Sequence, residues 1–376
     1  MTPSSILEEI YHQTIVNLNH EWVEAPEILA NILIVSRDIR NRACVRFLMA
    51  CTLAKIDNED VDIRKPYTSI TGPGAYSGRR YDETYIEQFI SRYDLPCNTT
   101  TAFLTPALRN INIVLTPDLD LSGRPANVYQ AMLLLLDDVH KHRLSAYKLL
   151  HEIIRQLVLM RDETKQRMAT LIGSLKASRS DMSLSSEQII NLIEQHLKTK
   201  SARASRLPVL IIAAAYVAAR PYLKEKILPL KSHNAADSQT EALGDIEITL
   251  ETDSNVVTCY EMKQKRVSKG DIDRAIHEKL THTSHQVDNY IFVTTEDIEP
   301  SVAEYAETWY DQIGIEIVIL DCIGFLRHFL HLFHRQRTTF LNSYQDLLLA
   351  EPNSAVSQPL KEVFLALRHA AESDPM

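Results

Sequence analysis

The stretch GDIEITLETDSNVVTCYEMKQKR (Gly244 to Arg266) decides the fold of the second half of the chain. Apolar and polar residues alternate on both sides of the polar segment ETDSN, which is typical of two β-strands joined by a turn. The second strand ends with an acid and a base two positions apart, Glu261 and Lys263. Because side chains two positions apart in a strand point to the same side, the pattern predicts a hairpin with both charges on one face.

Strands and helices continue to alternate downstream of this hairpin. Strands are expected at about 245–251, 256–263, 289–295 and 315–321, and helices at 268–284, 299–314 and 323–349. Strands that alternate with helices at this spacing predict an α/β layer in which at least part of the sheet is parallel.

The first half of the chain has a different pattern. Apolar residues recur at helical spacing from the N-terminus to about residue 57, and again over 126–176 and 183–200. Between the first two helical regions, DVDIRKPYTSITGPGAYSGRRYDETY (60–85) shows little periodicity and holds three of the nine glycines. A long ordered loop in a compact domain is usually functional. The sequence therefore predicts a mainly helical region at 1–200, followed by a second domain at 201–376 that ends in a short tail.

Composition sets the broad class of protein. The 376 residues are 45% hydrophobic and 24% charged, as in an ordinary globular protein. The longest apolar run, Leu207 to Ala219, is too short to cross a bilayer and predicts a buried helix that stops at Pro221, so no membrane partner is expected. Five cysteines without a CxxC pair predict free thiols in a reducing, cytoplasmic setting. The net charge of −9 excludes a surface coated with positive charge but not DNA binding, which depends on where basic residues cluster.

The polar face of the hairpin groups two acids with a lysine. Asp245 begins the first strand, and antiparallel pairing can bring it close to Glu261 and Lys263. Two carboxylates forced together repel each other, and a divalent cation relieves that repulsion. Mg²⁺ is commonly held by one or two carboxylates, waters and a substrate phosphate, and it acidifies a bound water. A lysine can stabilise the charge that develops on a phosphodiester during hydrolysis. These three residues are therefore candidates for a metal-dependent nuclease site.

Spacing alone does not separate such a site from a surface ion pair. The chain has a second Glu-x-Lys, Glu163 and Lys165 in RDETKQR, within a helical pattern where positions two apart do not face each other. We interpret that copy as solvated surface. For the strand copy and Asp245, the residues alone leave a nuclease site and a surface ion-pair ladder equally open.

Further acids surround the first strand. Glu241 precedes the strand and could assist as an auxiliary acid, while Asp237 could compete with Asp245 for the same role. Glu247 and Glu251 are interpreted as a solvated strand edge, with Glu247 kept as a further candidate to assist Asp245.

The layout resembles the motif of the PD-(D/E)XK nuclease superfamily, in which an acid starts one strand and acid-x-lysine lies on the next; Gly244 stands in place of the motif's proline. More narrowly, the chain is similar to the SacI family of type II restriction endonucleases over most of its length, through DIRKPYTSITGPGAYSGRRYDETYI, LPCNTTTAFLTPALRN and HNAADSQTEALGDIEI. The resemblance implies an α/β fold with a PD-(D/E)XK nuclease-like core, a mixed sheet flanked by helices. It also implies that 201–376 is the catalytic domain and that 1–200 carries DNA-recognition loops.

The resemblance implies an activity as well. This activity is Mg²⁺-dependent, sequence-specific hydrolysis of phosphodiester bonds in double-stranded DNA, giving 5′-phosphate ends. Asp245 and Glu261 would be metal ligands and Lys263 the catalytic lysine. A homodimer on a palindromic site and a cognate DNA methyltransferase as genetic partner are implied too. Two alternatives stay open: another nuclease of the superfamily, repair or modification-dependent, and a non-catalytic DNA-binding protein with a nuclease-like domain.

The irregular segment is a candidate for reading DNA. Glycines there let the backbone approach a groove closely, and arginine can discriminate guanine edges; the basic residues are Arg64, Lys65, Arg79 and Arg80. The alternative is a structural loop whose arginines pair with nearby acids, namely Asp62, Asp82 or Glu83.

A second basic segment is KTKSARASR (198–206). The basic region continues to Lys224 and Lys226, and it could line the path of the DNA phosphates together with Lys265, Arg266 and Lys269. The alternative is that these residues are basic only because helix ends and linkers often are.

Overall fold

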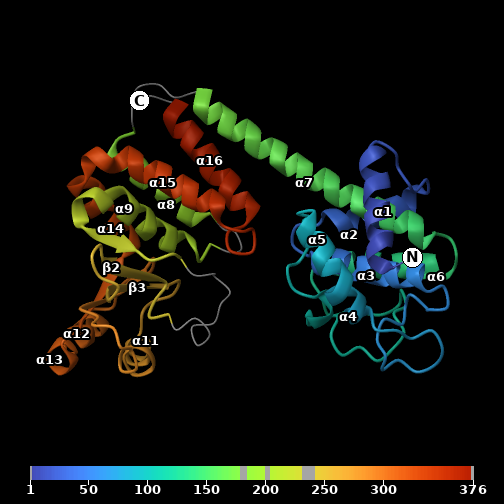
Figure 1. The fold of residues 1–376 in the computed structure, drawn as a ribbon, viewed down its shortest axis with the longest axis horizontal. Coiled ribbons are helices and arrows are strands. Elements are labelled where there is room, and N and C mark those ends of the chain that lie inside the picture. Colours follow the sequence, from blue (N-terminus) through green and yellow to red (C-terminus); the bar gives the residue numbers. More distant parts are fainter. Residues whose placement is uncertain (1, 178–183, 200–203, 231–241, 374–376) are drawn as a thin grey trace. The chain divides into compact units, whose positions relative to one another are not determined.

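The computed structural model describes residues 2–177, 184–199, 204–230 and 242–373. The chain divides into two compact units, Met1–Arg167 and Met168–Met376 (Figure 1). Each unit has its own hydrophobic core, so each is described separately below.

The division between the units falls within helix α7 (Ala146–Ala177), earlier than the boundary near residue 200 that the sequence suggested. The reason is that α8 (Ser186–Lys198) packs on helices of the second unit, α14 (Cys322–Leu332) and α16 (Gln358–Ser373). Leu175, near the end of α7, is buried in the same core.

The first unit is helical and is built around α3 (Ala43–Asp57). Every residue from Ala43 to Ala54 is buried, including Arg46, whose charge is paired with the buried Asp82. The elements around α3 are α1 (Pro3–Val16), α2 (Pro26–Arg37), α4 (Gly78–Tyr81), η1 (Asp82–Ile86), α5 (Glu87–Arg92), η2 (Ala102–Leu104), α6 (Ala126–His140) and the first part of α7. The helical regions predicted from the N-terminus to residue 57 and over 126–176 are confirmed.

The segment predicted to be irregular over 60–85 is helical in its last part. Ser77 caps α4 by accepting a hydrogen bond from the backbone N–H of Arg80 at 3.3 Å. A β-carbon at Gly78 would lie 2.5 Å from the ring of Phe103, so only glycine lets this helix start against the core. The π-helix η1 follows directly.

The second unit contains a five-stranded mixed sheet in the order β1-β2-β3-β4-β5. Its strands are β1 (Glu225–Ile227), β2 (Ile246–Leu250), β3 (Val256–Lys263), β4 (Asn289–Thr294) and β5 (Glu316–Asp321). β1, β2 and β3 pair antiparallel, whereas β3, β4 and β5 pair parallel. The four predicted strands and the partly parallel sheet are confirmed, and β1 is an additional strand.

Helices cover both faces of this sheet (Figure 1). On one face, Tyr260 and Val293 belong to a core with α8, α9 (Leu207–Leu223), α14, α15 (Arg337–Ala350) and α16. On the other face, Cys259, Tyr290 and Phe292 pack with α11 (Lys269–Arg274), the π-helix η3 (Ala275–Leu280) and α12 (Pro300–Glu307), and α13 (Tyr310–Ile313) follows α12. The α/β class expected from the sequence is therefore present in this unit.

Helix α9 is buried as predicted, but it does not stop at Pro221. The helix runs on to Leu223 and ends where Lys224 adopts a left-handed conformation with φ 54°. Proline removes a single intrahelical hydrogen bond, which does not end a helix by itself so close to its terminus.

Within the described ranges, no helix combines the length and the apolar character needed to cross a membrane. All five cysteines are free thiols.

Candidate active site

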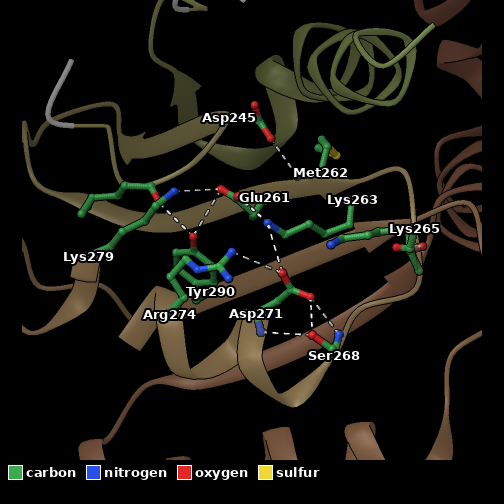
Figure 2. Close-up of polar contacts among 12 residues, drawn as sticks. Asp245, Glu261, Met262, Lys263, Lys265, Ser268, Asp271, Arg274, Lys279 and Tyr290 are labelled. Carbon is green, nitrogen blue, oxygen red and sulfur yellow. Dashed lines mark hydrogen bonds and ion pairs between the residues drawn. The ribbon is translucent and has the colours of Figure 1, made fainter. Parts of the chain in front are cut away.

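The hairpin register places Asp245 beside the Glu-x-Lys segment. β2 pairs with β3 so that Ile246 lies opposite Tyr260, and Asp245, one residue before β2, continues this register opposite Glu261. Oδ2 of Asp245 accepts a hydrogen bond from the backbone N–H of Met262 at 2.8 Å (Figure 2). The expected hairpin is thus confirmed, and it brings Asp245, just before β2, next to the strand β3 that carries Glu261 and Lys263.

Gly244 lets the chain enter β2 close to β3. A β-carbon at this position would lie 2.6 Å from the carbonyl oxygen of Tyr260, a separation that folded proteins essentially never show. Proline would meet the same obstacle. The structure therefore gives a steric reason for the glycine that precedes Asp245.

The carboxylate of Glu261 is shared between two ammonium groups. Its Oε1 accepts from Nζ of Lys263 at 3.0 Å, and its Oε2 accepts from Nζ of Lys279 at 3.1 Å (Figure 2). The three side chains are 15%, 20% and 14% exposed, respectively, so solvent screens these charges only partly. Glu261 and Lys263 share one strand face, as predicted, and they contact each other directly.

Lys279 and Tyr290 are site residues that sequence reasoning missed. The hydroxyl of Tyr290 donates to the carbonyl of Leu243 at 2.9 Å and lies 3.4 Å from Oε2 of Glu261. Burial raises the pKa of Tyr290 well above its ordinary value, so its hydroxyl stays a donor. The sequence pattern that could have indicated Lys279 lies in the predicted helix 268–284. There, polar residues recur at helical spacing along a stripe next to the apolar one, and Lys279 belongs to this polar stripe.

Asp271 supports Lys263 from the start of α11. Its Oδ1 lies 3.9 Å from Nζ of Lys263, and its Oδ2 accepts hydrogen bonds from the backbone N–H and hydroxyl of Ser268 at 3.0 and 2.6 Å. Burial acts to raise the pKa of Asp271, but the bonds from Ser268 and the nearby lysines outweigh it and lower the pKa. Asp271 is therefore a fixed negative charge that helps to keep Lys263 in place.

Asp245 carries the opposite shift. Burial, and then the charge of Glu261, raise its pKa above the ordinary value, against the lowering effect of the Met262 N–H and of Lys279. A carboxyl group whose pKa is raised by burial and by a neighbouring carboxylate is typical of sites that hold a proton or a cation.

A pocket of about 650 Å³ opens beside these residues. Glu261 and Lys263 contribute to its wall from β3, and Tyr290 and Phe292 from β4. One side of the α11–η3 segment supplies Asp271, Arg274, Glu278 and Lys279. The pocket therefore places charged groups of both signs where a phosphate could approach the sheet.

Asp245 and Glu261 are the two carboxylates that could hold a Mg²⁺ ion here, together with water and substrate. Asp245 and Glu261 supply carboxylates from adjacent strands, and Mg²⁺ is commonly bound through one or two carboxylates with several waters retained. Among the described residues, no group of three or more His, Cys, Asp or Glu side chains is arranged to hold a metal. These residues could therefore supply two carboxylates to a cation, but not an all-protein cage.

The other candidate acids have separate outcomes. Asp237 and Glu241 lie outside the described residues. The interpretation of Glu247 as solvated is wrong: the side chain is buried because its Oε1 accepts the backbone N–H of Leu243 at 2.8 Å. Glu251 is exposed, as expected.

In the first unit, Arg64 and Lys65 make contacts within the segment itself. Arg64 is bidentate to Asp62, with Nε and Nη2 each 3.1 Å from a carboxylate oxygen, and its Nη1 lies 3.7 Å from Asp137. Nζ of Lys65 donates to the carbonyl of Pro73 at 3.1 Å. The pairing with Asp62 is what the structural alternative predicted for Arg64.

The remaining predicted DNA contacts are exposed residues. Arg79 lies on α4 and pairs with Glu83 at 2.7 Å, and Arg80 follows it with its side chain exposed. Asp82, the third acid considered for these arginines, is fully buried and pairs with Arg46. In the second basic segment, residues 200–203 lie outside the described part. Lys265 is exposed in the loop after β3, and DNA contact by all these residues stays a prediction.

A scan against protein-family models and a search of curated proteins gave no match to this chain.

Proposed function

We propose that this chain is a Mg²⁺-dependent endonuclease of the PD-(D/E)XK type that hydrolyses phosphodiester bonds in double-stranded DNA, and more narrowly a type II restriction endonuclease. The observation that carries the proposal is that the hairpin register places Asp245 opposite Glu261 on the neighbouring strand, while Glu261 and its bonded neighbour Lys263 form part of the wall of an open pocket. A mixed sheet with helices on both faces supports it, because such a core is what the proposed class requires.

Each residue has a role in the proposed reaction. Asp245 and Glu261 would hold the cation, and a bound Mg²⁺ would polarise the scissile phosphate and acidify a water. Lys263 would stabilise the negative charge that develops on the phosphate in the transition state. Asp271, through its 3.9 Å contact with Nζ, would keep that ammonium oriented toward the pocket.

The partners follow from the same proposal. Exposed cations would contact the DNA phosphates and bases, with Arg79, Arg80 and Lys265 the accessible candidates and Arg64 and Lys65 contributing from the segment that they brace. A homodimer would match the two-fold symmetry of a palindromic site. A cognate methyltransferase would protect the DNA of the host cell.

The decisive experiment compares two lysines that occupy the same tripeptide pattern. Lys263→Ala should reduce Mg²⁺-dependent cleavage of plasmid DNA by about 10²- to 10³-fold, the range for removing one group that stabilises transition-state charge. Lys165→Ala, from the helical Glu-x-Lys, should cleave like the wild type. EDTA should abolish cleavage by all three proteins.

DNA binding provides the control for this comparison. Lys263→Ala should still bind DNA in Ca²⁺, because Lys263 acts on charge that develops only in the transition state. If Lys263→Ala cleaves as fast as Lys165→Ala, the assignment of the catalytic lysine is wrong.

The digestion pattern separates a restriction enzyme from other nucleases of this type. Discrete fragments from unmethylated DNA of known sequence, with 5′-phosphate ends, would support site-specific cleavage. A smear, or cleavage of modified DNA alone, would instead favour a repair or modification-dependent nuclease.

One observation favours a second function, a DNA-binding protein without catalysis. Both oxygens of Glu261 are already paired with lysines, so the site is charge-balanced without a cation. This alternative requires DNA binding without Mg²⁺-dependent cleavage of any of a broad set of DNAs.

A further inference from the structure

Lys279 approaches Glu261 from the helical layer that packs on the sheet, and not from the sheet itself. It lies on the π-helix η3, which packs against the same sheet face that carries Glu261. Its Nζ donates to Oε2 of Glu261 at 3.1 Å, and only 14% of its side chain is exposed. π-helical turns occur often at functional sites, because the wider turn changes the direction of a side chain.

The two lysines on Glu261 are not equivalent. Lys263 lies on the same strand as Glu261 and is also within 3.9 Å of Asp271. Lys279 comes from a different element, and its charge acts on both carboxylates, through the contact with Glu261 and through its lowering effect on the pKa of Asp245. Lys279 thus bonds one of the two acids, Glu261, and its charge also acts on the other, Asp245.

We propose that Lys279 is the resident counter-ion of the Asp245–Glu261 pair and that a divalent cation displaces its ammonium from Glu261. The inference rests on the proposed function only in taking these two acids as the metal ligands. A divalent cation and an ammonium at 3.1 Å from the same carboxylate oxygen would compete for its negative charge. Metal binding therefore frees one oxygen of Glu261 and moves Lys279 within the pocket.

The pocket offers the released ammonium other contacts. Glu278 and Asp271 line the same cavity of about 650 Å³ on the α11–η3 side. The four-carbon stem of lysine is flexible, so Nζ can change partners without movement of the helix. A phosphate entering the pocket would meet Lys279 in this second position.

Calorimetry without DNA tests the competition directly. Lys279→Met should bind Mg²⁺ roughly tenfold more tightly than the wild type, since one positive charge and one competing hydrogen bond are removed. Lys279→Arg should stay near the wild-type affinity. Lys198→Met is the matched control, because Lys198 in α8 of the same unit also forms an ion pair with a glutamate, Glu194 at 3.2 Å, but its own side chain is 76% exposed. The control should leave Mg²⁺ affinity unchanged.

A second readout uses stability in place of affinity. In EDTA, Lys279→Met should melt at a lower temperature than the wild type, because Glu261 and Asp245 lose a shared positive charge. Saturating Mg²⁺ should reduce that difference. Circular dichroism verifies that the variant is folded, and Lys279→Gln serves if the methionine variant is not.

The outcomes separate the inference from the proposed function. Unchanged or weaker Mg²⁺ binding by folded Lys279→Met overturns the counter-ion role; if the wild type still cleaves DNA with Mg²⁺, the proposed function stands. If the wild type neither binds Mg²⁺ nor cleaves DNA, the proposed function fails and the inference fails with it. Tighter binding by Lys279→Met together with wild-type behaviour of Lys198→Met supports the inference.

Discussion

The same tripeptide pattern, Glu-x-Lys, occurs once in a helix and once in a strand, and the two copies behave differently. In α7, Glu163 pairs with Arg37, and Nζ of Lys165 lies 3.3 Å from Asp94. The two side chains are 44% and 60% exposed. A helix turns by about 200° over two residues, so its i and i+2 side chains find separate partners.

In β3, Glu261 and Lys263 point the same way and contact each other at 3.0 Å, with 15% and 20% of their side chains exposed. A strand returns to the same face after two residues. The comparison teaches that this pattern has meaning only together with its secondary structure. It also supplies matched internal controls for substitutions at Glu261 and Lys263, namely Glu163 and Lys165.

The largest expected difference concerns the two glutamates. Glu261→Gln should lower Mg²⁺-dependent cleavage by about 10²- to 10³-fold, because a proposed metal ligand loses its charge. Glu163→Gln should cleave normally, since the partners of Glu163 are surface groups. Single-turnover cleavage of one plasmid at several Mg²⁺ concentrations measures both variants. Equal loss in the two variants would show that stability, and not the site, explains the effect.

Any comparison of the two copies requires both units to be folded, and a buried histidine in each unit sets an acid limit. Burial lowers the pKa of His151 in the first unit and of His196 in the second to about 4. Both are fully buried, and His196 is hydrogen-bonded to Tyr344 and to the carbonyl of Leu360, each at 3.0 Å. Between about pH 6.5 and 4 the unfolded chain binds a proton that the folded unit excludes, so stability falls as the pH falls through this range.

The predicted loss at pH 5 relative to pH 7.5 is about 2 kcal/mol for each unit. The chain has two tryptophans, Trp22 in the first unit and Trp309 in the second, so Trp309→Phe and Trp22→Phe each leave a fluorescence reporter in one unit. Denaturant unfolding of both variants at the two pH values gives the two losses separately. A free energy of unfolding that stays constant between these pH values would contradict the burial of neutral histidines.

Two glycines, one beside the strand copy and one in the helix of the other copy, differ in the space that a β-carbon would have. Gly244 precedes the strand that faces Glu261, and its β-carbon would lie 2.6 Å from a carbonyl oxygen; Gly173 lies in α7, where a β-carbon would meet nothing within 4 Å. Gly244→Ala should lose about 1–3 kcal/mol from overpacking and should displace Asp245. Gly173→Ala should gain about 0.5–1 kcal/mol of helix stability. Chemical denaturation at pH 7.5 measures both, and a neutral Gly244→Ala would mean that the approach to Tyr260 is loose.

The parts of this site that the sequence predicted depend on local periodicity. Alternation gave the two strands, the hairpin and the shared face of Glu261 and Lys263. The three-residue strand β1 is too short to show alternation, and it was missed. The hydrogen bond from the backbone N–H of Leu243 to Glu247 could not be predicted from the sequence either, because it depends on how the chain bends before β2.

The contacts that the sequence did not reveal join distant elements. Lys279 reaches Glu261 because the parallel connection between β3 and β4 carries η3 back across the sheet face. Tyr290 comes from the next strand of the sheet. Periodicity predicts which face a residue occupies, but not which neighbour the crossover helix will present to that face.

A coupling energy between the two side chains of each copy tests the comparison most directly. A double-mutant cycle of Glu261→Gln and Lys263→Met, followed by denaturation, should give about 1 kcal/mol, because the pair is mostly shielded from solvent. The same cycle with Glu163→Gln and Lys165→Met should give about zero, since these two side chains have other partners.

The strand cycle has a further test, because Lys279 also holds Glu261. In the wild-type background, Lys263→Met leaves Glu261 with one ammonium partner, which reduces the measured coupling. In a Lys279→Met background, Glu261 depends on Lys263 alone, so the coupling should rise above about 1 kcal/mol. A coupling that is the same in both backgrounds would mean that the two lysines act on Glu261 independently. The 3.0 Å pair on the strand would then be energetically separate from the Lys279 contact, although both lysines bond Glu261.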